Sequence, residues 1–192
     1  MKGSVAVREI QAYLLAPGSQ VPVGAAIGQL LDVAGLYAIT VQAPACLPPF
    51  FGSLLLERQH ACLYIGRTSK GRIPSLKRRL GNYDLRGKGD STFFSALGVM
   101  LGYRPPIGSL VGKKDNNIRF STDDRNRVAA WVEQNLTVAW RVLDPATVED
   151  LEPQLIRAIK PLLNWKHNPA KLEKLKVLRD GARRWARGCA AR

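Results

Sequence analysis

The segment that most constrains the fold is CLYIGRTSKGRIPSLKRRL, which covers residues 62–80. Its first half predicts a β-strand over 61–66, because its residues are apolar or β-prone and Gly66 marks an end. Its second half predicts a short helix, with Pro74 in the first turn, where a missing N–H costs little. The charged side chains of the segment are all basic, namely Arg67, Lys70, Arg72, Lys77, Arg78 and Arg79. An ordinary solvated helix does not need charge of one sign only, so the segment predicts a site for an anion.

The rest of the chain contains further strand and helix patterns. Strands are also predicted over 35–42 and 137–143. Side-chain alternation places Tyr37, Ile39 and Val41 on one face of the first of these strands. Helices are predicted over 93–101, 150–160 and 169–187. Before residue 35, VGAAIGQLLDV predicts a helix, whereas VAVREIQAYLL fits a helix or a strand.

Basic residues gather in two parts of the chain. Lys and Arg number 29 against 15 Asp and Glu, which gives a net charge of +14 at pH 7. Residues 63–90 hold eight basic and two acidic residues, and residues 165–192 hold nine basic and two acidic residues. These parts contribute +6 and +7, a distribution typical of proteins that bind nucleic acid. A solubility function or an affinity for acidic membranes would also fit the total charge, and both stay open at this point.

The cysteines are few and far apart. Cys46, Cys62 and Cys189 are odd in number and fit neither a disulfide framework nor a zinc spacing such as C-x2-C. They predict reduced thiols in a cytoplasmic protein, associated with the nucleoid if the source is prokaryotic. We expect no signal peptide, because Arg8 and Glu9 interrupt the first apolar run. No stretch approaches the roughly 18 apolar residues that a membrane span needs.

Several short motifs, each of little weight alone, occur in a specific order. GLY at 35–37 is followed by YIG at 64–66, then by SLKRRL at 75–80, and much later by Glu152 and KPLLN at 160–164. This order and spacing resemble the GIY-YIG nuclease superfamily, which includes homing endonucleases, some type II restriction enzymes and the bacterial excision-repair endonuclease. The most specific part of the resemblance is YIGRT followed by a helix of the form L-x-x-R-L.

The resemblance implies an α+β fold, in which a small three-stranded, mostly antiparallel sheet is flanked by helices. It divides the chain into an N-terminal helical extension over 1–34, a nuclease domain over 35–168 and a basic C-terminal helix over 169–192. The active-site positions of the family fall on Tyr37, Tyr64, Arg79, Glu152 and Asn164.

The chain departs from the family pattern at three places. Leu36 replaces the isoleucine of the first tripeptide, which is an apolar exchange. Tyr83 stands four residues after Arg79, where many members carry a histidine. Because residues four apart share a helix face, we expect Tyr83 beside Arg79 as an accessory hydrogen-bond donor. The loop over 43–60 is long, which affects the substrate side of the site.

The implied site residues suit phosphodiester hydrolysis. Arg79 can clamp the non-bridging phosphate oxygens, and Arg67 either assists it or contacts a neighbouring phosphate. A lone carboxylate such as Glu152 suits Mg²⁺ or Mn²⁺, which keep several waters and share the substrate phosphate. Tyr37 is the expected general base if neighbouring cations lower its pKa from about 10. Asn164 is uncharged and is expected only to orient other groups.

The position of Glu152 in its helix depends on where that helix begins. If Asp150 caps it, Pro153 lies in the first turn, and the positive helix end favours the charged form of Glu152.

We therefore expect a metal-dependent endonuclease that acts on double-stranded or branched DNA and has no membrane partner. A non-catalytic nucleic-acid-binding module on the same scaffold is the alternative, and an adaptor for a membrane surface or an acidic protein is a third. The basic side chains expected to contact phosphates without reading sequence are Lys70, Arg72, Lys77, Arg78, Lys171, Lys174, Arg179, Arg183, Arg184 and Arg187.

Overall fold

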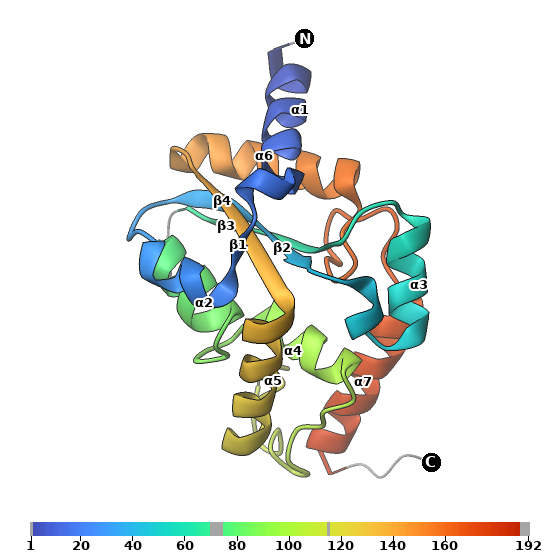
Figure 1. Ribbon diagram of the computed structural model, residues 1–192. Coiled ribbons are helices and arrows are strands. Elements are labelled where there is room, and N and C mark those ends of the chain that lie inside the picture. The colour runs from blue at the N-terminus through green and yellow to red at the C-terminus, as the bar shows by residue number, and fades with distance from the viewer. Residues whose placement is uncertain (1, 70–74, 115, 189–192) are drawn as a thin grey trace.

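A four-stranded antiparallel sheet lies at the centre of the computed structural model (Figure 1), which describes residues 2–69, 75–114 and 116–188. The strands are β1 (Val21–Pro22), β2 (Gly35–Val41), β3 (Cys62–Thr68) and β4 (Leu136–Val142). Their order across the sheet is β1-β4-β2-β3. The α+β class and the three predicted strands are confirmed, but a sheet of three strands is one too few. The missed strand, β1, is only two residues long and contains a proline, so no alternation of side chains reveals it.

Helices make up most of the remaining chain. They are α1 (Lys2–Leu15), α2 (Val23–Ala26), α3 (Pro49–Glu57), α4 (Thr92–Met100), α5 (Thr122–Asn135), α6 (Pro145–Ile159) and α7 (Glu173–Ala186). A π-helix, η4 (Lys77–Asp84), follows β3, and 3-10 turns form η1 (Pro17–Ser19), η2 (Ile27–Gln29) and η3 (Pro44–Cys46). Within the described ranges, no helix is both long and apolar enough to cross a membrane.

The sheet separates two apolar layers. On one face, Leu36, Ala38 and Ile65 pack in a cluster with α1 and α6, which lie above the sheet in Figure 1. On the other face, Tyr37 and Ile39 pack with residues of α2, η4, α4 and α5. The prediction that alternate side chains of β2 share a face is therefore confirmed. The motif tyrosines belong to the second layer, with Tyr37 inside it and Tyr64 packed against it.

Helix α6 begins earlier than the sequence pattern indicated. Asp144 is its N-cap, and one side-chain oxygen of Asp144 accepts a hydrogen bond from the Thr147 backbone N–H at 3.0 Å. Pro145 takes the first helical position, where proline is favoured. The predicted start at Asp150 was wrong, because this Asp-Pro pair is the stronger start signal. Glu152 therefore lies in the middle of α6 and gains nothing from the positive helix end.

Candidate active site

The two motif tyrosines lie on adjacent antiparallel strands. In the β2–β3 register, Tyr37 is opposite Gly66 and Ile39 is opposite Tyr64. The ring centroids of the two tyrosines are 6.5 Å apart. A Cβ atom at residue 66 would overlap the Tyr37 ring, so the glycine leaves room for that ring. Tyr37 is fully buried, whereas Tyr64 is half-buried.

The π-helix η4 decides which residue accompanies Arg79. A π-helix bonds residues five apart, as the Leu85 N–H does to the Leu80 carbonyl at 2.9 Å. This wider turn brings Asp84 to Arg79, with 3.4 Å between Nη2 and Oδ1. Tyr83 instead lies by Arg78, whose guanidinium carbon is 6.0 Å from the ring centroid.

Asp84 is a buried acceptor that sequence reasoning missed. It is fully buried and accepts hydrogen bonds from the Tyr37 hydroxyl and, at 2.5 Å, from the Ser91 hydroxyl. Burial raises the pKa of Asp84, while Arg79 and the two hydroxyl donors lower it. The only sequence signal was that Asp84 is one of two acidic residues in the basic region 63–90. A buried carboxylate needs partners of this kind.

The electrostatics around Tyr37 run opposite to our expectation. Burial raises the pKa of Tyr37 well above its ordinary value, and the Asp84 carboxylate raises it further, against the opposing effect of Arg79. Tyr64 is shifted upward as well, its pKa being raised chiefly by burial. Burial alone would lower the pKa of Arg79, but Asp84 and the two tyrosines raise it, so Arg79 stays charged. Neither tyrosine is therefore a phenolate near neutral pH.

A cavity of about 430 Å³ brings together residues that are far apart in the sequence. Tyr64, Glu152 and Asn164 line it, together with basic residues of α7. Its further lining includes Thr92, Ile156, Leu163, Trp165, Lys166 and His167. Tyr37 and Arg79 are not part of the lining, and Tyr37 lies behind Tyr64 in the packed layer. The predicted site residues thus fall into two groups. Three of them line the cavity, whereas Tyr37 and Arg79 belong to a neighbouring cluster that does not line it.

Glu152 is paired with Arg67. The Arg67 Nε atom lies 2.7 Å from Glu152 Oε2, and its Nη1 atom lies 3.4 Å from Glu149 Oε1. Burial raises the pKa of Glu152, while Arg67 lowers it. Arg67 therefore neutralises the Glu152 carboxylate and orients it.

Asn164 is committed to the backbone of β3. Its Oδ1 atom accepts from the Ile65 N–H at 2.8 Å, and its Nδ2 atom donates to the Ile65 carbonyl at 2.9 Å. Because β3 is an edge strand, these bonds complete the pairing that a neighbouring strand would supply. Asn164 therefore fixes the strand that carries Tyr64 and Arg67, in agreement with a purely orienting role.

The cavity lining contains two carboxylates, Glu152 and Asp180, and Asp180 is already paired with Lys176 and Arg183. Among the described residues, no three His, Cys, Asp or Glu side chains group together in a way that could hold a metal ion. One carboxylate fits Mg²⁺ or Mn²⁺ only where waters and a substrate phosphate complete the coordination. The chemistry of Glu152 at a cavity wall meets that requirement.

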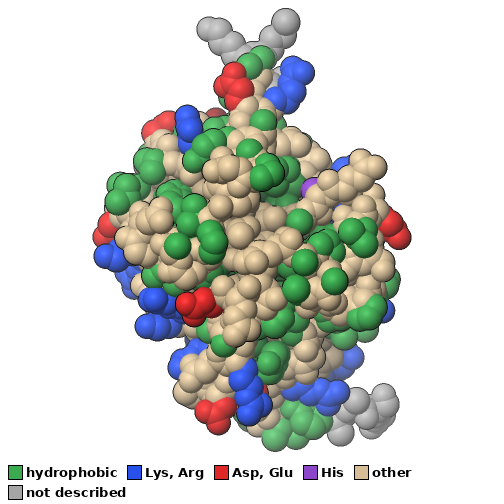
Figure 2. Space-filling view, in the orientation of Figure 1, with side chains coloured by type: hydrophobic (Ala, Val, Ile, Leu, Met, Phe, Trp, Pro, Cys, Tyr) green, Lys and Arg blue, Asp and Glu red, His purple; other side chains and the backbone are tan. Residues whose placement is uncertain are grey.

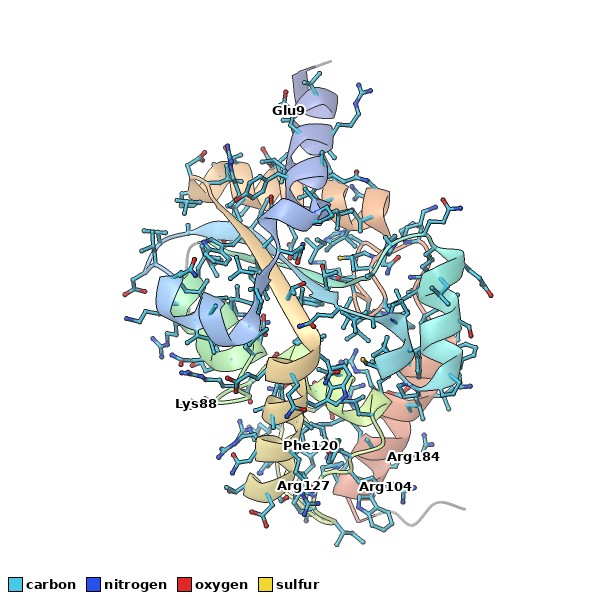
Figure 3. All side chains as sticks on the ribbon, in the orientation of Figure 1. Glu9, Lys88, Arg104, Phe120, Arg127 and Arg184 are labelled. Carbon is cyan, nitrogen blue, oxygen red and sulfur yellow. The ribbon has the colours of Figure 1, made fainter. Side chains whose placement is uncertain are left out.

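The predicted phosphate contacts are spread over several surfaces, and Figure 2 shows many Lys and Arg side chains around the lower part of the molecule. On α7, Arg179 and Arg183 line the cavity, while Arg184 lines a separate one with Arg104 and Trp185 (Figure 3). The remaining cations make local contacts: Lys171 over Trp165, Lys174 over Phe50, Arg187 Nη2 to Asn116 Oδ1, and Arg78 over Tyr83. Lys77 lies exposed on η4. Lys70 and Arg72 lie outside the described residues.

Comparison with known proteins gives one family. The family model described as the GIY-YIG catalytic domain matches residues 35–181, which is most of the chain and includes all five predicted site positions. No curated protein and no solved structure matches the chain. The match supports a nuclease in general, with a nucleic acid as its substrate.

Proposed function

Because the chain belongs to the GIY-YIG nuclease superfamily, we propose that it is a metal-dependent DNA endonuclease. The observation that carries this proposal is the cavity where Tyr64, Glu152 and Asn164 meet cations of α7. A polyanion fits the net charge of +14. Phosphodiester hydrolysis needs an activated water, neutralised phosphate charge and a stabilised leaving oxygen, which the phenol, guanidinium and carboxylate groups found here can supply. Double-stranded or branched DNA is the proposed substrate.

Glu152 is the proposed metal ligand. Its side chain is 19% exposed at the cavity wall, and Arg67 holds the carboxylate from the side of β3. Mg²⁺ or Mn²⁺ bound there supplies positive charge to the phosphate and to the leaving 3′ oxygen. Arg67 keeps one carboxylate oxygen oriented, which leaves the other for the ion.

Tyr37 and Asp84 are proposed to act together on the proton of the attacking water. Since Tyr37 is a neutral phenol, it can accept that proton only as its own proton passes to Asp84. The water oxygen then bonds to phosphorus, the bond from phosphorus to the 3′ oxygen breaks, and the leaving oxygen takes a proton from solvent. The raised pKa of Asp84 favours this transfer, because a buried carboxylate binds a proton more readily than an exposed one.

Arg79 is proposed to stabilise negative charge on two groups in this step, the Asp84 carboxylate and the phosphate. It pairs with Asp84 and donates through Nη1 to the Asp90 carbonyl at 3.3 Å. A guanidinium has five N–H donors, so further donors remain for a phosphate oxygen. Because Arg79 interacts electrostatically with Asp84 and with both motif tyrosines, it links the phosphate to the proton-accepting pair.

The test is cleavage of supercoiled, linear and branched DNA with Mg²⁺ or Mn²⁺, with mapping of the ends. We expect divalent-dependent cleavage that leaves 5′-phosphate and 3′-hydroxyl ends. The alternative, a non-catalytic binding module, is favoured by one observation: the Arg67–Glu152 ion pair satisfies the carboxylate without a metal. Tight DNA binding with no cleavage by either ion would support that alternative and contradict the endonuclease.

A further inference from the structure

One face of α7 contributes to the cavity. Its residues Lys176, Arg179, Asp180 and Arg183 line it, at a spacing of three and four that places them on one side of the helix. Tyr64 and Glu152 line the same cavity. Of these four residues, Arg179 and Arg183 were expected from the sequence to contact DNA phosphates.

Two of the three α7 cations in the cavity already have an acidic partner. Asp180 lies 3.9 Å from Lys176 Nζ and 2.9 Å from Arg183 Nη1. Arg183 also donates from Nε to the Asn116 carbonyl at 3.4 Å. The single carboxylate of Asp180 therefore offsets part of the positive charge of these two side chains.

Arg179 differs from its two neighbours. Its Nε atom is buried and has no hydrogen-bond partner among the residues that the structure describes. A buried N–H without an acceptor costs about 1–3 kcal/mol, and more on a charged group, so native proteins seldom keep one without a function. The guanidinium lies within electrostatic reach of Tyr64, which is one of the motif tyrosines. Arg179 thus lines the same cavity as Tyr64, and the Nε at the base of its guanidinium lacks an acceptor among the described residues.

We infer that Arg179 contacts the scissile phosphate and is a further catalytic residue of this site, an inference that rests on the proposed function. A phosphodiester oxygen would satisfy the buried Nε, and the planar guanidinium can offer a second, parallel N–H to the same group. Arg179 and Arg79 then approach the phosphate from α7 and η4. Helix α7 is thereby part of the active site and not only a surface for DNA.

The test compares Arg179→Gln and Arg179→Lys with Arg127→Gln, a control on α5 (labelled in Figure 3) that removes one exposed cation outside the cavity lining. Under single-turnover conditions with saturating DNA, Arg179→Gln should slow cleavage by about 10²–10³-fold, as loss of a transition-state donor does. Arg179→Lys should lie between this variant and the wild type, and Arg127→Gln should match the wild type. Arg179→Gln should melt no lower than the wild type, because it removes a buried donor that has no acceptor among the described residues, and Arg127→Gln should melt with the wild type. An Arg179→Gln rate equal to that of the control would overturn the inference.

A second readout separates this inference from the proposed function. The Nε–H resonance of Arg179, identified by its absence in Arg179→Gln, should shift when a short duplex oligonucleotide is added with Ca²⁺ in place of Mg²⁺. An unmoved Arg179 resonance, with DNA bound, would sink the inference even if the wild type cleaves DNA. A shifted resonance in a protein that never cleaves would keep the contact and overturn only the nuclease assignment.

Discussion

The hydroxyl of Tyr37 donates a hydrogen bond to the carboxylate of Asp84, and both side chains are fully buried. Asp84 is therefore the group to which Tyr37 can pass its proton. Its raised pKa excludes a standing phenolate near neutral pH, so any proton that Tyr37 accepts from water must be matched by one that it gives to Asp84.

Replacing Asp84 with asparagine tests this pair. Asparagine can still accept the Tyr37 hydrogen bond but cannot take its proton, so Asp84→Asn should lower the single-turnover rate by about 10²–10⁴-fold, the usual range for a lost general base. Tyr37→Phe should lower it as much. Since the two residues act as one unit, the double variant should be no slower than the worse single variant. If the rate losses of the two single variants multiply in the double variant, or if Asp84→Asn cleaves at the wild-type rate, then the two residues do not act as one unit.

Asn164 should matter for stability before it matters for chemistry. Asn164→Ala leaves the buried N–H and carbonyl of Ile65 without partners, which should lower the free energy of unfolding by about 2–4 kcal/mol. Gln154→Ala is the matched control, because it removes an exposed amide with one local bond and should cost no more than about 0.5 kcal/mol. Urea denaturation measures both. Equal stabilities for the two variants would show that Asn164 does not hold β3.

Cys62 should resist alkylation while the protein is folded. Burial raises the pKa of its thiol to about 12, and the thiolate is the reactive form, so at pH 8 the group stays protonated. Cys46 is exposed and should react with iodoacetamide. The assay is mass spectrometry of modified peptides in a Cys189→Ser background, with and without urea. Reaction of Cys62 in the folded protein as fast as that of Cys46 would contradict the burial.

A Tyr83 variant tests whether the π-helix turns Tyr83 away from the active site. It lines a second cavity, of about 510 Å³, with Gly89 and Arg119, and Glu152 is not part of that lining. The Tyr83→Phe variant should therefore cleave within about threefold of the wild-type rate, whereas a lost transition-state donor would cost 10²–10³-fold. A loss on the larger scale would restore the accessory role expected from the spacing of Tyr83 and Arg79.

The sequence predicts the centre of this fold well, because alternation and glycine boundaries are local signals. The strands that carry Tyr37 and Tyr64 follow from such signals, and so does the shared face of Tyr37 and Ile39. The two strands also pair with each other, antiparallel, in the sheet. The sequence therefore predicts the strands on which Tyr37 and Tyr64 lie, but not the side chains that surround them.

The sequence does not predict how the helices present their polar residues. A helix of period 3.6 pairs Arg79 with Tyr83, whereas the π-helix pairs it with Asp84, and no local signal distinguishes the two. The burial of Arg179 depends on where α7 docks, which is a property of the packed molecule. Charge counting placed Arg179 correctly on a basic helix but could not separate it from Arg184, which faces a different cavity.

The central claim is that Glu152 holds a metal ion for cleavage of DNA. The most direct measurement compares wild type, Glu152→Ala and Glu149→Ala for nicking of supercoiled plasmid with Mg²⁺, alongside DNA binding by each protein. Glu149 is the matched control, because its carboxylate also lies by Arg67 but is 50% exposed and does not line the cavity. The account predicts that Glu152→Ala abolishes nicking while binding DNA as tightly as the wild type or more tightly, and that Glu149→Ala nicks normally. Full nicking by folded Glu152→Ala would contradict the metal site.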